Sequence, residues 1–487
     1  MSLRTILRPR RARTSARSTA VRISSACGWA VRVGSSTSST REGKRCRRTY
    51  PDCRRTGETA LVLRGHTRRR LTVRIPVALI AVLALLLGQS ATAGPAAASQ
   101  SYPVSYHRFA LTAGEGTTVR SGALTLASSG FTAKTYADPY LGTTNTYDVG
   151  SWISTEWTTG FGFSELVSSW IAQTPSGTFV WVSMRARRDD GNLTKWYTMG
   201  IWASGDGDIY RTSVGHQGDA DGYIAIDTFF AKDHPMIGYQ LKLDLYRLRG
   251  LSASPSVTRI GAVASDPVNT KPYSPSTTTM TQDQILAVPQ YSQEIHSGQY
   301  PQYDGGGEAW CSPTSTSMVV GYWGNGPSKT EYGYVLKDYP RIADPWVDYA
   351  ARYVYDYHYQ GAGNWPFNVA YAGARGLDGE VTQLHSLAEA EQFIKAGIPL
   401  VASIAFTSNK LDGFLFKSTS GHLLVIVGFM ANGDPVVNDP AATSDATVQR
   451  VYDRTQFEQN WMTSTGGIVY VIHPASVPLP ASPLGNW

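Results

Sequence analysis

The chain has few cysteines, and three of its four lie near the start. Cys27, Cys46 and Cys53 fall in an arginine-rich stretch, and Cys311 follows much later. If that stretch is removed during maturation, Cys311 has no partner left for an internal disulfide. A lone thiol outside the cell is prone to oxidation, so it is retained either in a buried position or for its chemistry.

Basic residues are scarce over most of the chain. The whole chain has a formal net charge of +7; its first 74 residues carry +17, from 20 basic and three acidic residues, which leaves −10 for the rest. A nucleic-acid partner requires a basic surface that displaces counterions from phosphates. The acidic remainder therefore excludes nucleic acid as an expected partner.

Only one long apolar run stands out, Ile75–Leu87, which follows Arg68–Arg70 and precedes the small residues Ala91–Gly94. This order of segments is that of a secretory signal peptide, and the run is too short to span a membrane comfortably. We therefore predict that residues 68–98 are a signal peptide and that the mature protein is secreted, with no stable membrane span after cleavage. Thr67–Thr72 resembles a twin-arginine signal, so general secretory and twin-arginine export both stay open.

Residues 1–67 precede this signal and show no clear hydrophobic periodicity. A signal peptide normally begins a protein. We therefore interpret the stretch as a disordered leader or as residues upstream of the true start codon, and it indicates nothing about function.

Residues 101–265 show the alternation expected of β-strands. Runs such as Thr178–Met184 and Tyr239–Leu245 alternate in polarity, and turns such as Gly205–Asp208 separate such runs. Many short strands with little helical pattern are typical of an antiparallel β-sandwich. The sequence thus predicts a β-sandwich accessory domain.

The second half of the chain has a different pattern. Residues 266–284 are rich in Pro, Ser and Thr, which predicts an interdomain linker with few contacts. Residues 285–475 form a second predicted domain, and residues 476–487 a tail. In that domain we expect helices at 312–323, 344–357 and 387–396, and strands at 399–406, 422–429 and 435–438. Helices followed by strands indicate an α+β domain.

Cys311 lies at the predicted start of a helix. It follows the glycine-rich loop 304–310, and Pro313 with its neighbouring hydroxyl residues marks the first turn. The free amides and the dipole of a helix N-terminus stabilise a thiolate, which is the reactive form of cysteine. This position favours a catalytic thiol over one kept for packing.

A thiolate nucleophile needs a general base and a group that orients the base. His422 opens an apolar strand, Asn432-Gly433 forms a turn, and the returning strand reaches Asp439. A hairpin centred near Ala431 places residue 422 opposite residue 441, which puts Asp439 one diagonal step away on the same face. The sequence thus predicts a His–Asp pair to serve Cys311.

Four short motifs in this order resemble the C39-like peptidase family, a branch of the papain-like cysteine peptidases. The motifs are Val288-Pro289-Gln290-Tyr291-Ser292-Gln293, Cys311-Ser312-Pro313-Thr314-Ser315, Gly421-His422 and Asn438-Asp439-Pro440. The resemblance covers about residues 285–475. It implies an α+β papain-like catalytic domain, preceded here by the antiparallel β-sandwich domain.

The resemblance also implies a role for each site residue. Cys311 is the expected nucleophile, His422 the base and later the acid, and Asp439 the group that orients the imidazole. Gln293 is the expected oxyanion donor, together with the backbone N–H of Cys311.

The chain departs from the family pattern at two points. Ser312 stands where the family has Gly, which alters the first helical turn but leaves the amide available. The gap between Gln293 and Cys311 is long enough for Gln302 to be the oxyanion donor instead. We favour Gln293 because it lies in the Ser-Gln motif.

These observations predict a secreted cysteine peptidase that hydrolyses amide bonds of a peptide or protein substrate, cell-wall peptides included, through a thioester acyl-enzyme. The nine histidines show no zinc-site spacing, so we expect neither a metal nor an organic cofactor. Two alternatives stay open: a cell-wall amidase or endopeptidase of the NlpC/P60 type, and a catalytically inactive surface-binding protein. The Asn-Asp-Pro motif after the histidine strand favours the C39-like hypothesis.

Overall fold

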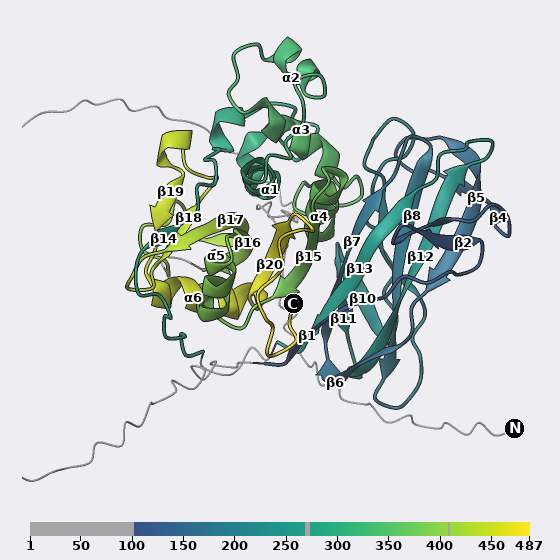
Figure 1. The fold of residues 1–487 in the computed structure, drawn as a ribbon, viewed down its shortest axis with the longest axis horizontal. Helices are drawn as coiled ribbons and strands as arrows, with labels where there is room; N and C mark the ends of the chain where they lie inside the picture. The colour runs from purple at the N-terminus through teal and green to yellow at the C-terminus, as the bar shows by residue number, and fades with distance from the viewer. Residues whose placement is uncertain (1–101, 268–272, 408–409) are drawn as a thin grey trace, which may run out of the picture. The chain divides into compact units, whose positions relative to one another are not determined.

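The computed structural model describes residues 102–267, 273–407 and 410–487 (Figure 1). The predicted leader and signal peptide, and the three cysteines that precede Cys311, lie outside these ranges. Within them, no helix is long and apolar enough to cross a membrane.

The N-terminal domain consists of two antiparallel sheets, which Figure 1 shows at the blue and teal end of the colour scale. The first sheet has the order β10-β11-β7-β13-β3-β2, with β1 paired to β13. Its strands are β1 (Val104–Arg108), β2 (Thr117–Arg120), β3 (Ala123–Leu126), β7 (Glu165–Gln173), β10 (Gly222–Ala225), β11 (Thr228–Ala231) and β13 (Ser256–Ser265). The second sheet has the order β4-β5-β12-β8-β9, with β6 paired to β12. Its strands are β4 (Thr132–Ala137), β5 (Thr144–Ile153), β6 (Trp157–Phe163), β8 (Thr178–Arg188), β9 (Tyr197–Trp202) and β12 (Met236–Leu248).

The predicted alternation of polarity explains the core between these sheets. Val180, Val182 and Met184 of β8 are fully buried, and Val182 lies opposite Leu243 of β12. Residues two apart in a strand point to the same face, so each sheet presents one apolar surface. Trp170 of β7 joins the same buried cluster from the other sheet, which shows that the two sheets pack against each other.

Among its described residues, the C-terminal domain combines six α-helices with one antiparallel sheet of order β15-β20-β16-β17-β18-β19, in which β14 also pairs with β17. Its helices are α1 (Cys311–Tyr322), α2 (Gly333–Asp338), α3 (Pro345–Val354), α4 (Trp365–Ala374), α5 (Leu387–Lys395) and α6 (Arg454–Thr465). Its strands are β14 (Gln284–Ile285), β15 (Asp378–Gln383), β16 (Leu400–Phe406), β17 (Thr419–Phe429), β18 (Pro435–Asn438), β19 (Gln449–Val451) and β20 (Ile468–His473). The predicted helices and strands are therefore present, with ends shifted by a few residues.

Helices cover both faces of this sheet. Leu423 and Val425 of β17 share one core with α1, α3 and α4. Leu424 and Ile426 share another core with α5 and α6. Because successive residues of a strand point to opposite faces, β17 is buried on both sides, which explains why its sequence is continuously apolar.

Residues 273–284 of the predicted linker are anchored by hydrogen bonds, so the expectation of few contacts was wrong for this described part. The Ser276 amide donates to Glu458 over 3.0 Å, and its hydroxyl accepts from Arg454 over 2.8 Å. The Thr279 amide donates to Glu391 over 2.7 Å. Glu391 and Glu458 are fully buried, and buried carboxylates need hydrogen-bond donors. The hydroxyls and amides of this segment supply some of these donors.

The predicted tail is also packed against the C-terminal domain. Asn486 is fully buried, and its side-chain amide donates to the Gln383 carbonyl and to Glu389, each over 2.9 Å. The Trp487 ring lies 5.0 Å from the Phe393 ring of α5. The last residues therefore complete the core on the α5 face.

Helix α4 packs against the N-terminal domain. The Phe367 ring packs edge-on to the Trp170 ring of β7, and the Gln173 amide donates to the Gly373 carbonyl over 2.9 Å. Arg259 of β13 pairs with Asp378 and with Glu380 of β15.

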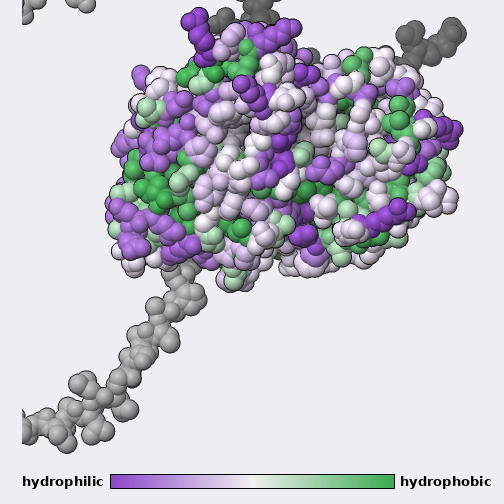
Figure 2. Space-filling model, turned by 45° about the horizontal axis from the view of Figure 1, so that its top comes forward, coloured by the Kyte–Doolittle hydropathy of each residue, from purple (hydrophilic) through white to green (hydrophobic). Residues whose placement is uncertain are grey.

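On the face drawn in Figure 2, apolar residues are dispersed among polar ones.

Candidate active site

Cys311 is the first residue of α1, as predicted, and it is fully buried. The loop before it turns sharply: Gly306 has a φ of 126°, a value that suits glycine. A Cβ on Gly307 would lie 2.4 Å from both the Gln293 carbonyl oxygen and the His296 carbonyl carbon. The glycine-rich loop therefore allows the chain that carries Gln293 to pack directly against the start of α1.

Cys311 forms a disulfide in the full chain, and the other three cysteines lie outside the described residues. The expectation of an unpaired thiol concerns the chain after removal of the leader, so it stays a prediction. Because a disulfide sulfur is no nucleophile, the chemistry expected of Cys311 requires its reduced form.

His422 and Asp439 form a buried pair, with 2.8 Å between His422 Nε2 and Asp439 Oδ1. The pairing of β17 with β18 sets Val425 opposite Asn438. This register extrapolates to residue 441 opposite His422, so Asp439 lies one diagonal step away. The expected pairing of residue 422 with residue 441 is thus confirmed, and it includes a register shift between Ile426 and Gly428 that the turn alone does not predict.

Further bonds fix the carboxylate of this pair. The Tyr452 hydroxyl donates to Asp439 Oδ2 over 3.1 Å, and the Ala441 amide donates to Oδ1, also over 3.1 Å. Asp439 therefore has a defined orientation, and the imidazole bonded to it is oriented in turn. Tyr452 was missed by sequence reasoning because it lies outside all four motifs.

Aromatic rings cover the imidazole. The rings of Phe414 and Phe416 both stand edge-on to His422, with centroids 5.6 and 5.7 Å away. His422 is only 1% exposed. The His–Asp pair is therefore closed off from solvent in this state.

Gln293 connects the two halves of the site. Its backbone amide donates to the Pro440 carbonyl, and its side-chain Nε2 donates to the Glu308 carbonyl, each over 2.8 Å. Pro440 directly follows Asp439, and Glu308 lies three residues before Cys311. Gln302, the alternative oxyanion donor, is exposed.

Helix α1 and strand β17 bring Cys311 and His422 to the same region. The Ser315 hydroxyl, one turn after Cys311, donates to the Leu423 carbonyl over 3.1 Å. Leu423 is the residue next to His422. The turn of α1 that begins with the cysteine therefore lies against the part of β17 that carries the histidine.

Two acidic residues near the site were not anticipated. Burial raises the pKa of Glu294, and the neighbouring Glu308 raises it further, whereas His422 lowers it. Asp348 forms a second buried pair, with 2.9 Å between its Oδ2 and His296 Nδ1, beside the ring of Trp310. Glu294 directly follows the Ser-Gln motif, which is the one sequence signal that pointed to this neighbourhood.

Comparison with known protein families gives one match in each of the two domains. Residues 285–468 match the Peptidase_C39 like family. The predicted resemblance of this region to the C39-like peptidases is thus confirmed. Residues 101–265 match the family described as Peptidase C39 N-terminal domain. The descriptions of both matched families therefore name C39 peptidases. No curated protein matches the chain.

The C39-like domain contains all four predicted site residues. Two of them, His422 and Asp439, are in direct contact, and Gln293 reaches from the loop after Asp439 to the loop before Cys311. All four are at most 1% exposed. The arrangement can orient an imidazole near a helix N-terminus, which is the requirement for activating a thiol.

Proposed function

We propose that the chain is a secreted peptidase of papain-like fold that hydrolyses amide bonds with the reduced thiol of Cys311. The observation that carries this proposal is the buried His422–Asp439 pair, held at 2.8 Å in a domain whose first α-helix begins at Cys311. A packing role for these residues would not require an oriented imidazole beside the start of a helix.

In this proposal the two ring nitrogens of His422 have different tasks. Because Nε2 of His422 is bonded to Asp439, Nδ1 is the nitrogen that exchanges a proton with the thiol of Cys311. The thiolate attacks the substrate carbonyl, and the imidazolium gives its proton to the leaving amine as the C–N bond breaks. Water then hydrolyses the thioester with His422 as the base, which regenerates the thiol and releases the carboxylic acid.

The oxyanion that forms at each step needs two donors. The Cys311 backbone N–H is one, because the first amides of a helix have no partner within the helix. Gln293 Nε2 is the other, and in the closed state this atom donates to the Glu308 carbonyl. Because Nε2 also donates to Glu294 Oε1 over 3.3 Å, catalysis requires the Gln293 side chain to exchange one of these two bonds for one to the oxyanion.

Substrate access requires the site to open. The Phe414 and Phe416 rings cover His422, and Phe416 itself is 40% exposed. Rotation of these rings away from the imidazole would uncover the base without unfolding any strand. We propose that peptide binding stabilises this open arrangement.

One rival has an observation in its favour. The burial of all four residues and the disulfide of Cys311 also suit a catalytically inactive domain with a binding role. The two hypotheses differ in what reduction does, because a peptidase gains activity with a reductant and an inactive domain does not.

The deciding experiment measures turnover of a fluorogenic peptide library by the full chain, with and without dithiothreitol. We expect activity only under reducing conditions, and its loss in Cys311→Ala and His422→Ala. The matched control is His234→Ala, since His234 forms an exposed pair with Asp189 over 2.9 Å in the N-terminal domain. Full activity in Cys311→Ala would refute the proposal, and no turnover by the reduced chain would favour the inactive alternative.

A further inference from the structure

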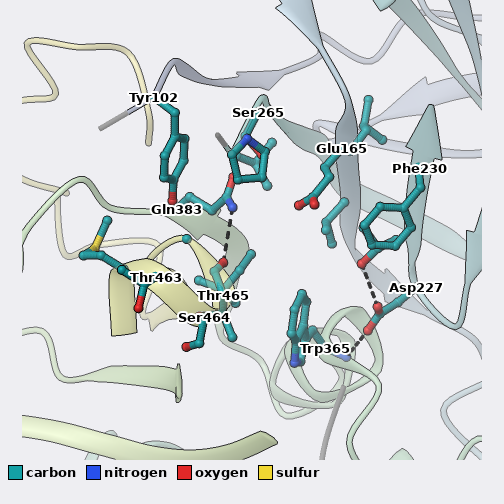
Figure 3. Close-up of a pocket in the computed structure, with 18 of the residues that line it drawn as sticks. Tyr102, Glu165, Asp227, Phe230, Ser265, Trp365, Gln383, Thr463, Ser464 and Thr465 are labelled. Carbon is teal, nitrogen blue, oxygen red and sulfur yellow. Dashed lines mark hydrogen bonds between the residues drawn. The ribbon is translucent and has the colours of Figure 1, made fainter. Parts of the chain in front are cut away.

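A pocket lies between the N-terminal domain and the C39-like domain, and none of the four proposed catalytic residues lines it (Figure 3). Its volume is about 80 Å³. Glu165 of β7 and Tyr102, which precedes β1, line it from the N-terminal domain. Trp365 of α4, Gln383 of β15 and Thr465 of α6 line it from the other domain.

The pocket has an acidic wall. The carboxylate of Glu165 points into the pocket in Figure 3, and no described residue forms an ion pair with it. Burial and the nearby Asp266 raise the pKa of Glu165 to about 7. Asp227 is a second lining carboxylate, which accepts a hydrogen bond from the Trp365 amide over 2.8 Å. Once Glu165 is ionised, no described residue that lines the pocket carries a positive charge to balance it.

The opposite wall carries a polar group without a partner. Tyr102 is 6% exposed, and its hydroxyl has no hydrogen-bond partner among the described residues. Figure 3 shows this hydroxyl beside Gln383, across the pocket from Glu165. Burial raises the pKa of Tyr102, and Glu165 raises it further, so the hydroxyl stays protonated and lies within electrostatic reach of that carboxylate.

The remaining lining residues narrow the choice of ligand. No Lys, Arg or His is among the described residues that line the pocket, so these residues offer an anion no positive charge. The rings of Phe230 and Trp365 and the side chains of Val167 and Met462 supply aromatic and apolar surface. Aromatic faces and carboxylates together suit an organic cation.

We propose that this pocket binds a small organic ammonium ion, whose N–H groups donate to the Glu165 carboxylate and to the Tyr102 hydroxyl oxygen. The cation neutralises the acidic wall, and its alkyl part contacts the apolar side chains. This binding site is separate from the proposed peptidase chemistry and does not depend on it.

The proposal sets the direction of the pH dependence. The titratable groups that line the pocket beside Glu165 are Asp227, Tyr102 and Tyr273, and the charge of Asp266 acts on Glu165 from the end of β13. Since an ammonium ion favours the ionised carboxylate, its affinity rises as the pH increases through about 7, where Glu165 loses its proton. A neutral ligand of the same size shows no such rise.

The experiment titrates the full chain with propylammonium chloride and follows binding by saturation-transfer difference NMR at pH 6 and pH 8. n-Butanol and sodium propionate serve as the neutral and anionic probes of similar size. We expect saturable binding of propylammonium alone, tighter at pH 8. Glu165→Gln, which keeps the shape of the side chain, is expected to weaken it by about tenfold or more, and Tyr102→Phe by about two- to tenfold.

The control is Glu115→Gln, which makes the same charge change at an exposed position outside the pocket. Unchanged affinity in folded Glu165→Gln, or equal binding of n-butanol, would overturn the proposal. Lys271 lies outside the described residues and belongs to the segment between Pro267 and Tyr273, which both line the pocket. Unaltered binding in Lys271→Gln supports an external ligand, whereas binding seen only in that variant would mean that the chain supplies its own ammonium group.

Discussion

Tyr452 shows how much of the site depends on a single hydroxyl outside the motifs. Its hydroxyl donates to the Asp439 oxygen that does not contact His422. In Tyr452→Phe the carboxylate keeps its bonds to His422 and to the Ala441 amide, so we expect a fall in turnover of about two- to tenfold with intact folding. The measurement is kcat on the peptide identified in the library screen.

The matched control for this variant is Tyr239→Phe. Tyr239 is a buried tyrosine of the N-terminal domain whose hydroxyl donates to the Ala262 carbonyl over 3.2 Å. An equal loss of turnover in both variants would indicate a general effect on stability and would contradict a role of Tyr452 in orienting Asp439.

Alanine variants of the two candidate oxyanion donors, Gln293 and Gln302, should differ sharply in turnover. Gln293→Ala removes an oxyanion donor, and loss of one such donor lowers turnover by about 100-fold or more. Gln302→Ala, at the exposed position, should leave turnover nearly unchanged. The comparison uses kcat/KM of both variants, and the reverse ranking would assign the oxyanion site to Gln302.

At the scale of elements, residues 273–283, which precede β14, stabilise the C-terminal domain, although their composition suggests a linker with few contacts. Ser276→Ala removes the hydroxyl that bonds Arg454 and Glu458, while the backbone bond to Glu458 remains. We expect the free energy of unfolding to fall by about 1–2 kcal/mol, because buried charged groups lose a partner. Urea denaturation followed by circular dichroism measures this change.

Ser274→Ala is the control for Ser276→Ala, since it makes the same substitution two residues earlier at an exposed position. A change in stability as large as that of Ser276→Ala would show that the anchoring bonds are not responsible. The same contacts imply that a domain beginning at Gln282 lacks the segment that bonds Glu391 and Glu458, and is therefore less stable than the full chain.

At the scale of the whole molecule, buried carboxyl groups determine how stability responds to pH. Burial raises the pKa of Glu165, Asp227, Asp304 and Asp344 from ordinary values near 4 to about 7. Each group holds its proton more tightly in the folded state than in the unfolded state. Their contribution to stability is therefore full at low pH and is lost as the pH rises from about 4 to about 7.

We therefore expect a lower thermal midpoint at pH 8 than at pH 5. The pKa values of His107 and His473 are lowered by burial, and these groups act in the opposite direction, but only below about pH 6.5. Asp227→Asn keeps an acceptor for the Trp365 amide and cannot ionise, so it should reduce the drop by about 2–4 °C.

Asp233→Asn is the comparison for Asp227→Asn, since Asp233 is exposed. Scanning calorimetry at the two pH values measures both variants and the unmodified chain. A midpoint that rises from pH 5 to pH 8 would contradict the assignment of raised pKa values to these carboxyl groups.

The sequence by itself determined the features that depend on neighbours along the chain. The glycine-rich loop and Pro313 located the start of α1 at Cys311, because helix termini are specified by residues within one turn. The Asn432-Gly433 turn brought Asp439 into the neighbourhood of His422, because a hairpin turn sets which strand segments pair, although an irregularity between Ile426 and Gly428 shifts the final register.

Only the tertiary structure decided the contacts between distant segments. Ser276 and Glu458 are 182 residues apart, and nothing periodic marks their bond, so composition alone suggested a loose linker. The pocket that Glu165 and Tyr102 line, and the packing of the Phe414 ring against His422, are likewise not marked by any pattern in the sequence. Local patterns encode the elements and their apolar faces, whereas partners for single buried polar groups are selected only when whole elements pack together.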